Sequence, residues 1–149
     1  MEGKQKTILN LFEENELNVG ILYKLYSQKI TRHKFFWLKL SMEEVSHASD
    51  IHAAFRKNSE TLFKETKFTR GVLRYVMDFV EEKIQEARGK KISHIEALND
   101  ALRIEQSIIE KKCFELFIPT DNKLKDVLRK LNKETEKHIS ILRKEFKRQ

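Results

Sequence analysis

Apolar side chains recur at alternating steps of three and four residues along almost the whole chain, and this spacing most restricts its fold. It places the apolar residues on one face of a helix. The chain has only one Pro and four Gly, so it holds few of the residues that end helices or make turns. Strand-type alternation is hard to find. The sequence therefore predicts an all-α fold, with a single domain over its 149 residues.

The spacing divides the chain into five amphipathic segments. The predicted helices span about residues 7–29, 32–64, 70–87, 93–117 and 121–147. The third is the shortest, so we expect four long helices and one shorter helix in the connection between the second and third long ones. Gly89 suits the end of that shorter helix, and Ser93 with Glu96 forms a capping box before the next.

The break between the first two helices is weakly marked. Thr31 is a candidate cap for the second helix, but no Gly or Pro separates the two. Periodicity alone would also allow one continuous helix of nearly fifty residues. We prefer a break, because helices of that length are rare in globular proteins.

Polar groups interrupt the apolar stripe of each long helix near its middle. These polar members of the stripes are Glu16, Glu44, His47, Glu105, Thr135 and His138. A bundle packs such stripes together, so its interior would hold three carboxylates and two imidazoles. Buried unpaired charges are costly, whereas a divalent metal would neutralise the carboxylates. Carboxylate and imidazole ligands suit iron, manganese or zinc, so the sequence predicts a metal site.

This ordered set resembles the ferritin-like di-iron carboxylate proteins, and most of all their rubrerythrin-type branch. That family has Glu on its first helix, Glu-x-x-His on its second, Glu on its third and Glu-x-x-His on its fourth. In the rubrerythrin branch a Tyr often follows the first Glu by seven residues, as Tyr23 follows Glu16. The resemblance covers about residues 7–146. It implies a left-handed four-helix bundle, a break near Thr31 and a long crossover between helices two and three.

The resemblance also implies a cofactor and the residues that hold it. The cofactor would be iron, as one or two ions, with manganese or zinc as alternatives. The metal ligands would be Glu16, Glu44, His47, Glu105 and His138. Tyr23 becomes a candidate catalytic residue beside the metal.

One part of the family pattern is missing in the last helix, which reads KETEKHIS. Thr135 stands three residues before His138, where the family has its second bridging Glu. Thr135 itself and Glu134 are candidates for an extra or substitute ligand, Glu134 if the helix is locally distorted. Ile108 replaces a further Glu that the rubrerythrin branch often carries, and the rubredoxin-like cysteine module is absent. The predicted di-iron ligand set is therefore incomplete.

Two functions follow from this pattern. The first is an iron protein that reacts with oxygen or peroxide, as an oxidase or peroxidase, or that handles iron. A peroxidase would need an external electron donor. The second is a ferritin-like fold with a decayed site that serves as an interaction or assembly module. Ferritin-like bundles commonly pair through long helices, so we expect a homodimer in either case.

Charge and composition weigh against other classes. The net charge of +7 suggests nucleic acid, but the 30 Lys and Arg are interleaved with 23 Asp and Glu, and no binding motif is present. Cys113 is the only cysteine, so no intrachain disulfide can form. The start of the chain does not read as a signal peptide, and no apolar run approaches membrane-spanning length. We therefore expect a cytoplasmic protein. We expect His33, His52 and His94 to lie at its surface or in helix caps.

Overall fold

The computed structural model describes residues 8–57, 67–110 and 122–149, and within these ranges it is helical, without strands. The all-α prediction is confirmed. The elements are α1 (Ile8–Lys29), the short 3-10 helix η1 (Thr31–His33), α2 (Lys34–Lys57), α3 (Lys67–Gly89), α4 (His94–Glu110) and α5 (Asn122–Lys147). The predicted extensions of the second helix to residue 64 and of the fourth to residue 117 lie outside the described residues.

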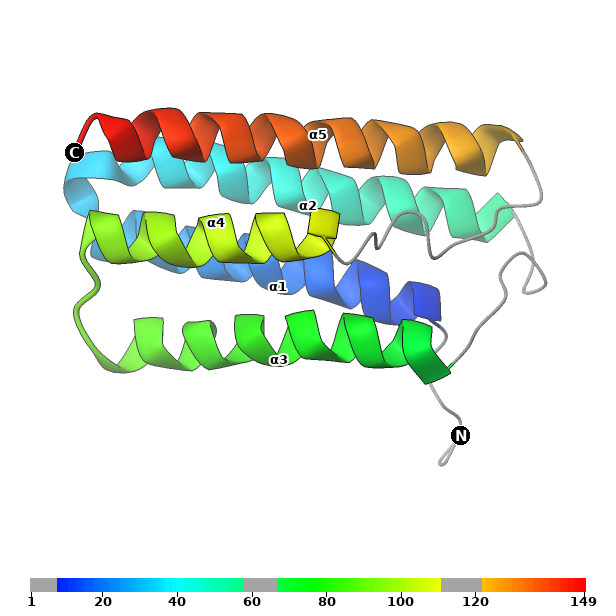
Figure 1. Ribbon diagram of the computed structural model, residues 1–149, viewed down its shortest axis with the longest axis horizontal. Helices are drawn as coiled ribbons and strands as arrows, with labels where there is room; N and C mark the ends of the chain where they lie inside the picture. Colours follow the sequence, from blue (N-terminus) through cyan, green and yellow to red (C-terminus); the bar gives the residue numbers. More distant parts are fainter. Residues whose placement is uncertain (1–7, 58–66, 111–121) are drawn as a thin grey trace.

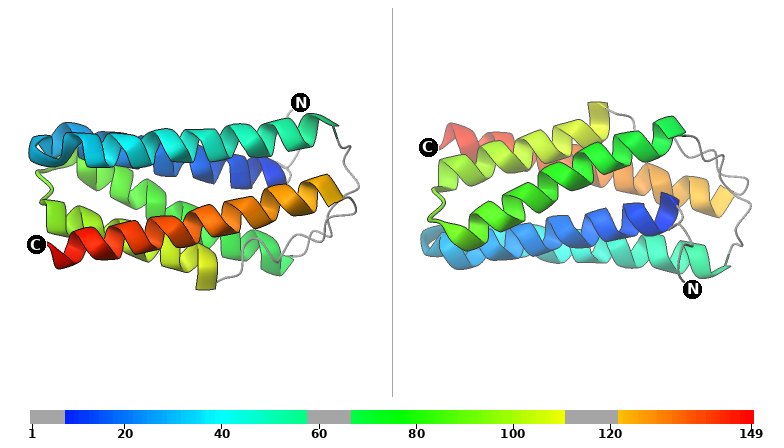
Figure 2. Two further views of the ribbon diagram at one scale, coloured as in Figure 1. Left: turned by 90° about the horizontal axis from the view of Figure 1, so that it is seen from above. Right: turned by 90° about the horizontal axis from the view of Figure 1, so that it is seen from below.

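The five helices lie side by side along one axis, and each runs opposite to the one before it (Figure 1). Consequently α2 and α4 run in the same direction, because α3 carries the chain back between them. The closest backbone approaches join α1 to α2 and α3, α4 to α3 and α5, and α2 to α5. The views along the other direction show the same arrangement, with α5 beside α2 and α3 beside α1 (Figure 2). The helices therefore form a closed ring around one interior.

The third helix is longer than the sequence suggested. It was predicted as a shorter helix over residues 70–87, but α3 has 23 residues, against 22 in α1 and 17 in α4. The prediction was wrong because α3 begins at Lys67 and passes through Gly71 without a break. Its buried face, which includes Val72, Val76 and Val80, packs along the bundle and supports a full-length helix.

The chain does break between α1 and α2, as expected near Thr31. Ile30 leaves the helical region, with φ −112° and ψ 73°, and its N–H donates to the carbonyl of Tyr26 at 2.8 Å. The His33 N–H donates to the Ile30 carbonyl at 3.0 Å. Thr31 lies within η1, three residues before α2 begins, so its predicted role as a cap of α2 was wrong. Backbone hydrogen bonds of the 3-10 turn take the place of a side-chain cap.

The cap at the start of α4 agrees with the sequence prediction, but the buried face of the helix differs from the predicted one. Ser93 Oγ accepts the Glu96 N–H at 3.1 Å, which confirms Ser93 as the cap. Ile95 follows the apolar spacing of this helix, but it is 47% exposed. The buried face of α4 instead includes Ala97 and Ala101. Their small side chains allow the helices to pack closely. A prediction based on large apolar residues does not identify these alanines as part of the buried face.

Large apolar and aromatic side chains fill the interior between the helices. The largest fully buried ones are Trp37, Tyr23, Tyr26, Phe12, Leu22, Leu73, Met77, Leu98, Ile104, Ile108 and Leu131. The same interior also holds acidic and imidazole side chains. No helix among the described residues is both long and apolar enough to cross a membrane.

Candidate metal centre

All five residues predicted as metal ligands are buried in the interior of the helix ring. They come from α1, α2, α4 and α5, whereas α3 contributes none of them. Their exposed fractions are 1% for Glu16, 2% for Glu44, 5% for His47, 1% for Glu105 and 0% for His138. Three acidic residues and two histidines are thus removed from water on four separate helices.

These residues form two groups that share Glu44. The first group is Glu16, Glu44 and His47, and the second is Glu44, Glu105 and His138. Glu44 Oε1 lies 3.0 Å from Nδ1 of His138, and Glu44 Oε2 lies 3.5 Å from Nδ1 of His47. The two imidazole rings are stacked, with centroids 5.5 Å apart. The Glu44 carboxylate therefore directs one oxygen toward each histidine, as a bridge between two ions would.

The spacing of the donor atoms fits metal ions of ordinary size. In each group, one ligand atom per residue lies within 4.8 Å of the others. Ligands on opposite sides of an ion such as zinc are separated by about 4.4 Å at most, because each bond is roughly 2.0–2.2 Å long. Small side-chain movements would therefore close each group on one ion. Carboxylate oxygen with imidazole nitrogen is also the donor set that iron, manganese and zinc accept.

Hydrogen bonds and protons hold the cluster together without a metal. Burial opposes the charged forms, but hydrogen bonds from Glu16, His138 and His47 bring the pKa of Glu44 well below its ordinary value. A hydrogen bond between the carboxyl groups of Glu16 and Glu44 requires that one of them be protonated. Burial likewise disfavours the imidazolium of His138, yet its hydrogen bonds to Glu105 and Glu44 raise its pKa to about 11.

The charge of Glu105 is less well compensated than that of Glu44. Burial and the nearby charge of Glu44 raise the pKa of Glu105 to about 7, although contact with His138 acts in the opposite direction. Its Oε1 lies 3.3 Å from Nδ1 of His138. Protons on the imidazole and carboxyl groups therefore occupy positions that metal bonds would take, and metal binding must release them.

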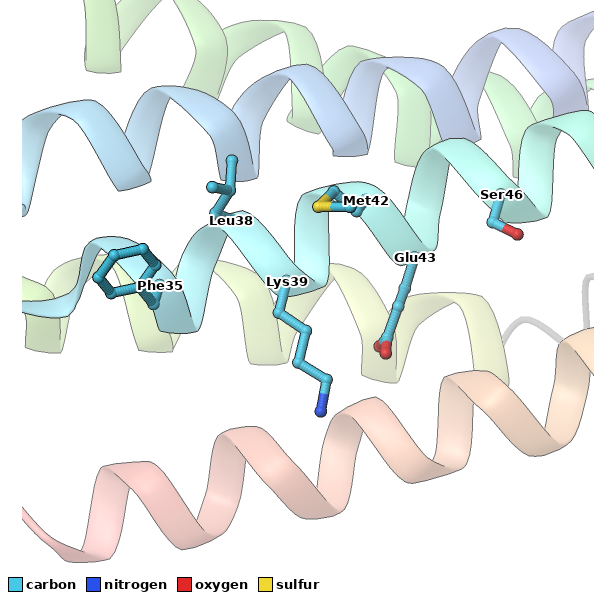
Figure 3. A pocket seen from close by; sticks show the side chains of 6 residues that line it. All are labelled: Phe35, Leu38, Lys39, Met42, Glu43 and Ser46. Atoms are coloured by element: carbon cyan, nitrogen blue, oxygen red, sulfur yellow. The ribbon is translucent and has the colours of Figure 1, made fainter.

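Glu43 is a member of this site that the sequence reasoning missed. Its Oε1 lies 2.8 Å from Nε2 of His138, on the side of the ring away from Glu44. Glu43 extends from α2 at the edge of an apolar groove on the outer face of that helix (Figure 3). It stands immediately before Glu44 in the sequence, so it does not lie on the helix face that carries Glu44 and His47. The only signal in the sequence was its spacing of four residues from His47.

Neither group includes Thr135 or Glu134, the two further candidate ligands on α5. Thr135 is buried, and its Oγ1 donates to the carbonyl of Leu131 in its own helix at 2.9 Å. Glu134 is half-buried and belongs to neither group of candidate ligands among the described residues. The carboxylate that contacts the other ring nitrogen of His138 comes from Glu43 of α2.

Tyr23 lies directly beside the candidate ligands. It is fully buried, and its hydroxyl donates to Glu105 Oε1 at 3.0 Å. Burial, followed by the charges of Glu105 and Glu44, raises the pKa of Tyr23 well above its ordinary value. The phenol therefore stays protonated and acts as a hydrogen-bond donor to the cluster.

A second histidine cluster lies at the end of the bundle where α2 and α4 begin and α5 ends. It consists of His33, His94 and Glu145. The rings of His33 and His94 stack at 3.6 Å between centroids, and His94 Nε2 lies 2.9 Å from Glu145 Oε2. His94 was expected at the surface or in a cap, but it is buried. Its contacts come from residues distant in sequence, and the local pattern gave no signal of them.

Comparisons with protein-family models, with curated proteins and with solved structures found no match to this chain.

Proposed function

We propose that this protein binds iron in the interior of a ferritin-like helix bundle and that the bound iron reacts with oxygen or peroxide. The observation that carries the proposal is the position of Glu44, whose two carboxylate oxygens each face a different histidine. A carboxylate in this position would bridge two metal ions and neutralise part of the charge of each.

The course of the chain supports the same proposal. Within the set α1, α2, α4 and α5, the first and last helices run one way and the middle two run the other (Figure 1). A long crossover between the second and third helices of a ferritin-like bundle produces this order, and here α3 fills it. The candidate ligands come from these four helices alone.

The candidate ligands would form two ion positions at this site. Glu16 and His47 would complete the first ion position with Glu44, and Glu105 and His138 would complete the second. Bound iron would supply electron transfer to oxygen or peroxide. The surrounding apolar side chains exclude bulk water from the carboxylates, which strengthens their hold on a cation.

The experiment is iron-dependent consumption of hydrogen peroxide and oxygen by protein loaded with Fe(II). We expect the wild-type protein to oxidise bound Fe(II) faster than free Fe(II) under the same conditions. Glu44→Gln should lose that acceleration, because it removes the charge shared by both positions. Glu136→Gln is the matched control, since Glu136 is exposed on α5. Equal rates in the wild-type protein and Glu44→Gln would contradict the proposal.

A second candidate function is an assembly module with a decayed site, and the outer face of α2 favours it. Phe35, Met42 and Val45 are 80%, 66% and 48% exposed, and they follow one stripe along the helix. Phe35 and Met42 line the groove that also includes Glu43 (Figure 3). Exposed apolar stripes of this kind mark interaction surfaces. Metal analysis of protein purified without chelators separates the two functions, because an assembly module needs no metal.

A further inference from the structure

Three oxidisable aromatic side chains lie in contact between the candidate metal centre and one end of the bundle. Tyr23, Tyr26 and Trp37 are all fully buried. The ring centroids of Tyr23 and Trp37 are 5.6 Å apart, and those of Tyr26 and Trp37 are 5.0 Å apart. The chain has one Trp and three Tyr, so only Tyr75 lies elsewhere, and it is 53% exposed on α3.

Each of the three aromatic side chains donates its polar hydrogen to a base on α4. The Tyr23 hydroxyl donates to Glu105 Oε1 at 3.0 Å, and the Tyr26 hydroxyl donates to Asp100 Oδ2 at 3.0 Å. The Trp37 indole N–H donates to His94 Nδ1 at 3.1 Å. Loss of one electron makes a phenol, and to a lesser degree an indole, far more acidic. A base beside a buried ring therefore favours its oxidation, because the proton can leave and no unpaired cation stays buried.

Hydrogen bonding alone would be ordinary, because buried Tyr and Trp side chains usually find an acceptor. The distinguishing feature is that the three rings are contiguous and that the two ends of the series differ. Tyr23 is bonded to Glu105, a candidate metal ligand. Trp37 is bonded to His94, which stacks on His33, and the His33 side chain is 33% exposed. The series thus connects the buried cluster with the surface.

The cluster at the surface end is better suited to protons than to a metal. Because Trp37 donates to His94 Nδ1, a neutral His94 carries its proton on Nε2 and donates it to Glu145 at 2.9 Å. A metal on Nε2 would require a proton on Nδ1, which would then face the indole N–H. His94 can instead receive a proton at Nδ1 and release one from Nε2 to Glu145.

We propose that Trp37, Tyr26 and Tyr23 carry single electrons from the His33–His94 end of the bundle to the candidate metal centre. This inference rests on the proposed function, since the centre must hold an oxidant. The overall reaction would be the two-electron reduction of hydrogen peroxide, which takes two electrons and two protons and yields two waters. A soluble one-electron donor at the His33 end would supply the electrons, and the two protons would come from solvent water.

Each single-electron step balances within the contacts described. Tyr23 gives one electron to the centre, and its hydroxyl proton moves to Glu105. Trp37 then gives one electron to Tyr23, directly or through Tyr26. The phenol regains its proton, while the indole proton moves to His94 Nδ1. The external donor reduces Trp37, and the proton returns from His94 to the indole nitrogen.

The test uses the metal-free protein, so it does not depend on metal binding. A laser flash that photoionises Trp37 creates an oxidised indole at a single known position, because the chain has one Trp. We expect the absorption of the tryptophanyl radical to decay while that of a tyrosyl radical grows. The rate should be independent of protein concentration, as required for transfer within one molecule.

Conservative variants identify the tyrosines that receive the oxidising equivalent. The double variant Tyr23→Phe with Tyr26→Phe keeps the rings, and it should lose the growth of the tyrosyl signal. Tyr75→Phe is the matched control and should retain it. Absence of transfer in the wild-type protein, transfer that persists in the double variant, or its loss in Tyr75→Phe would each overturn the proposal.

A second measurement separates this proposal from the function on which it rests. Trp37→Phe, loaded with Fe(II), should bind the same amount of iron and oxidise it at the same initial rate as the wild-type protein. Continued peroxide consumption with ascorbate as the electron donor should be slower in the variant. If iron does not bind to either protein, the proposed function fails. If iron binds and Trp37→Phe sustains wild-type turnover, the electron path is wrong.

Discussion

Both ring nitrogens of His138 contact carboxylates, and the contacts of the two nitrogens have different roles. Nδ1 faces Glu44 and Glu105 inside the cluster, whereas Nε2 faces Glu43 at 2.8 Å. A histidine that binds a metal commonly donates its other ring N–H to a carboxylate, which fixes the orientation of the ring and increases its basicity. Glu43 therefore acts as a positioning residue for the nitrogen that would bind the metal.

Removal of the Glu43 side chain should weaken the second ion position. For Glu43→Ala we expect the Kd of one ion to rise by about 10- to 100-fold, as is typical when the carboxylate partner of a ligating histidine is lost. Glu43→Gln should have a smaller effect, because its amide oxygen still accepts from Nε2. Equilibrium titration with Fe(II) or Co(II) measures both. Glu136→Ala is the control, and an equal loss of affinity there would contradict the assigned role.

Thr135 offers a test in which the two candidate functions predict opposite signs. Thr135→Glu restores Glu-x-x-His on α5 and adds a carboxylate at a buried position beside His138. Without metal, the added buried charge should lower the free energy of unfolding by a few kcal/mol. With Fe(II), the charge is paired, so affinity and melting temperature should rise above those of the wild-type protein. Lost stability that Fe(II) does not restore would favour the decayed site.

At the scale of the elements, a close approach of α1 and α2 brings Glu16 and Glu44 together. Gly20 makes this approach possible, because a Cβ at its position would lie 3.2 Å from Val45 Cγ2 and 3.6 Å from Glu44 Cβ. The hydroxyl of Ser41 also donates to the Gly20 carbonyl at 2.7 Å. The helix pair is therefore fixed one turn away from Glu16.

A pair of glycine substitutions tests this contact. Gly71 lies inside α3, and a Cβ there would meet nothing within 4 Å. Gly71→Ala should therefore raise the free energy of unfolding by about 0.5–1 kcal/mol, through helix propensity alone. Gly20→Ala should gain less or lose stability, because Val45 must move. Urea unfolding of the metal-free variants measures both, and an equal gain in the two would contradict the close contact.

Spacing along a helix explains which parts of the site could be predicted from sequence. Glu16, Glu44 and His138 were found because side chains three or four residues apart share a face whatever the helix packs against. Glu43 lies off the stripe, and its contact with His138 depends on how α2 and α5 are rotated about their axes. The burial of His94 depends in the same way on Trp37 and Glu145, which lie 57 and 51 residues away along the chain.

At the scale of the whole molecule, the candidate centre exists only when the helix ring is assembled. Its ligands come from four helices, and the two groups meet at Glu44. Metal binding must therefore stabilise the folded state, because the unfolded chain does not bring these residues together. The aromatic series from Tyr23 to Trp37 likewise joins the middle of the bundle to the end where η1, α4 and α5 meet.

The most direct test of the metal centre is anomalous diffraction from crystals grown with Fe(II) under anaerobic conditions. The account predicts anomalous peaks bonded to Glu44, with one peak beside His47 and the other beside His138. Peaks found only at His33, His94 and Glu145, or no peak at Glu44, would contradict the account.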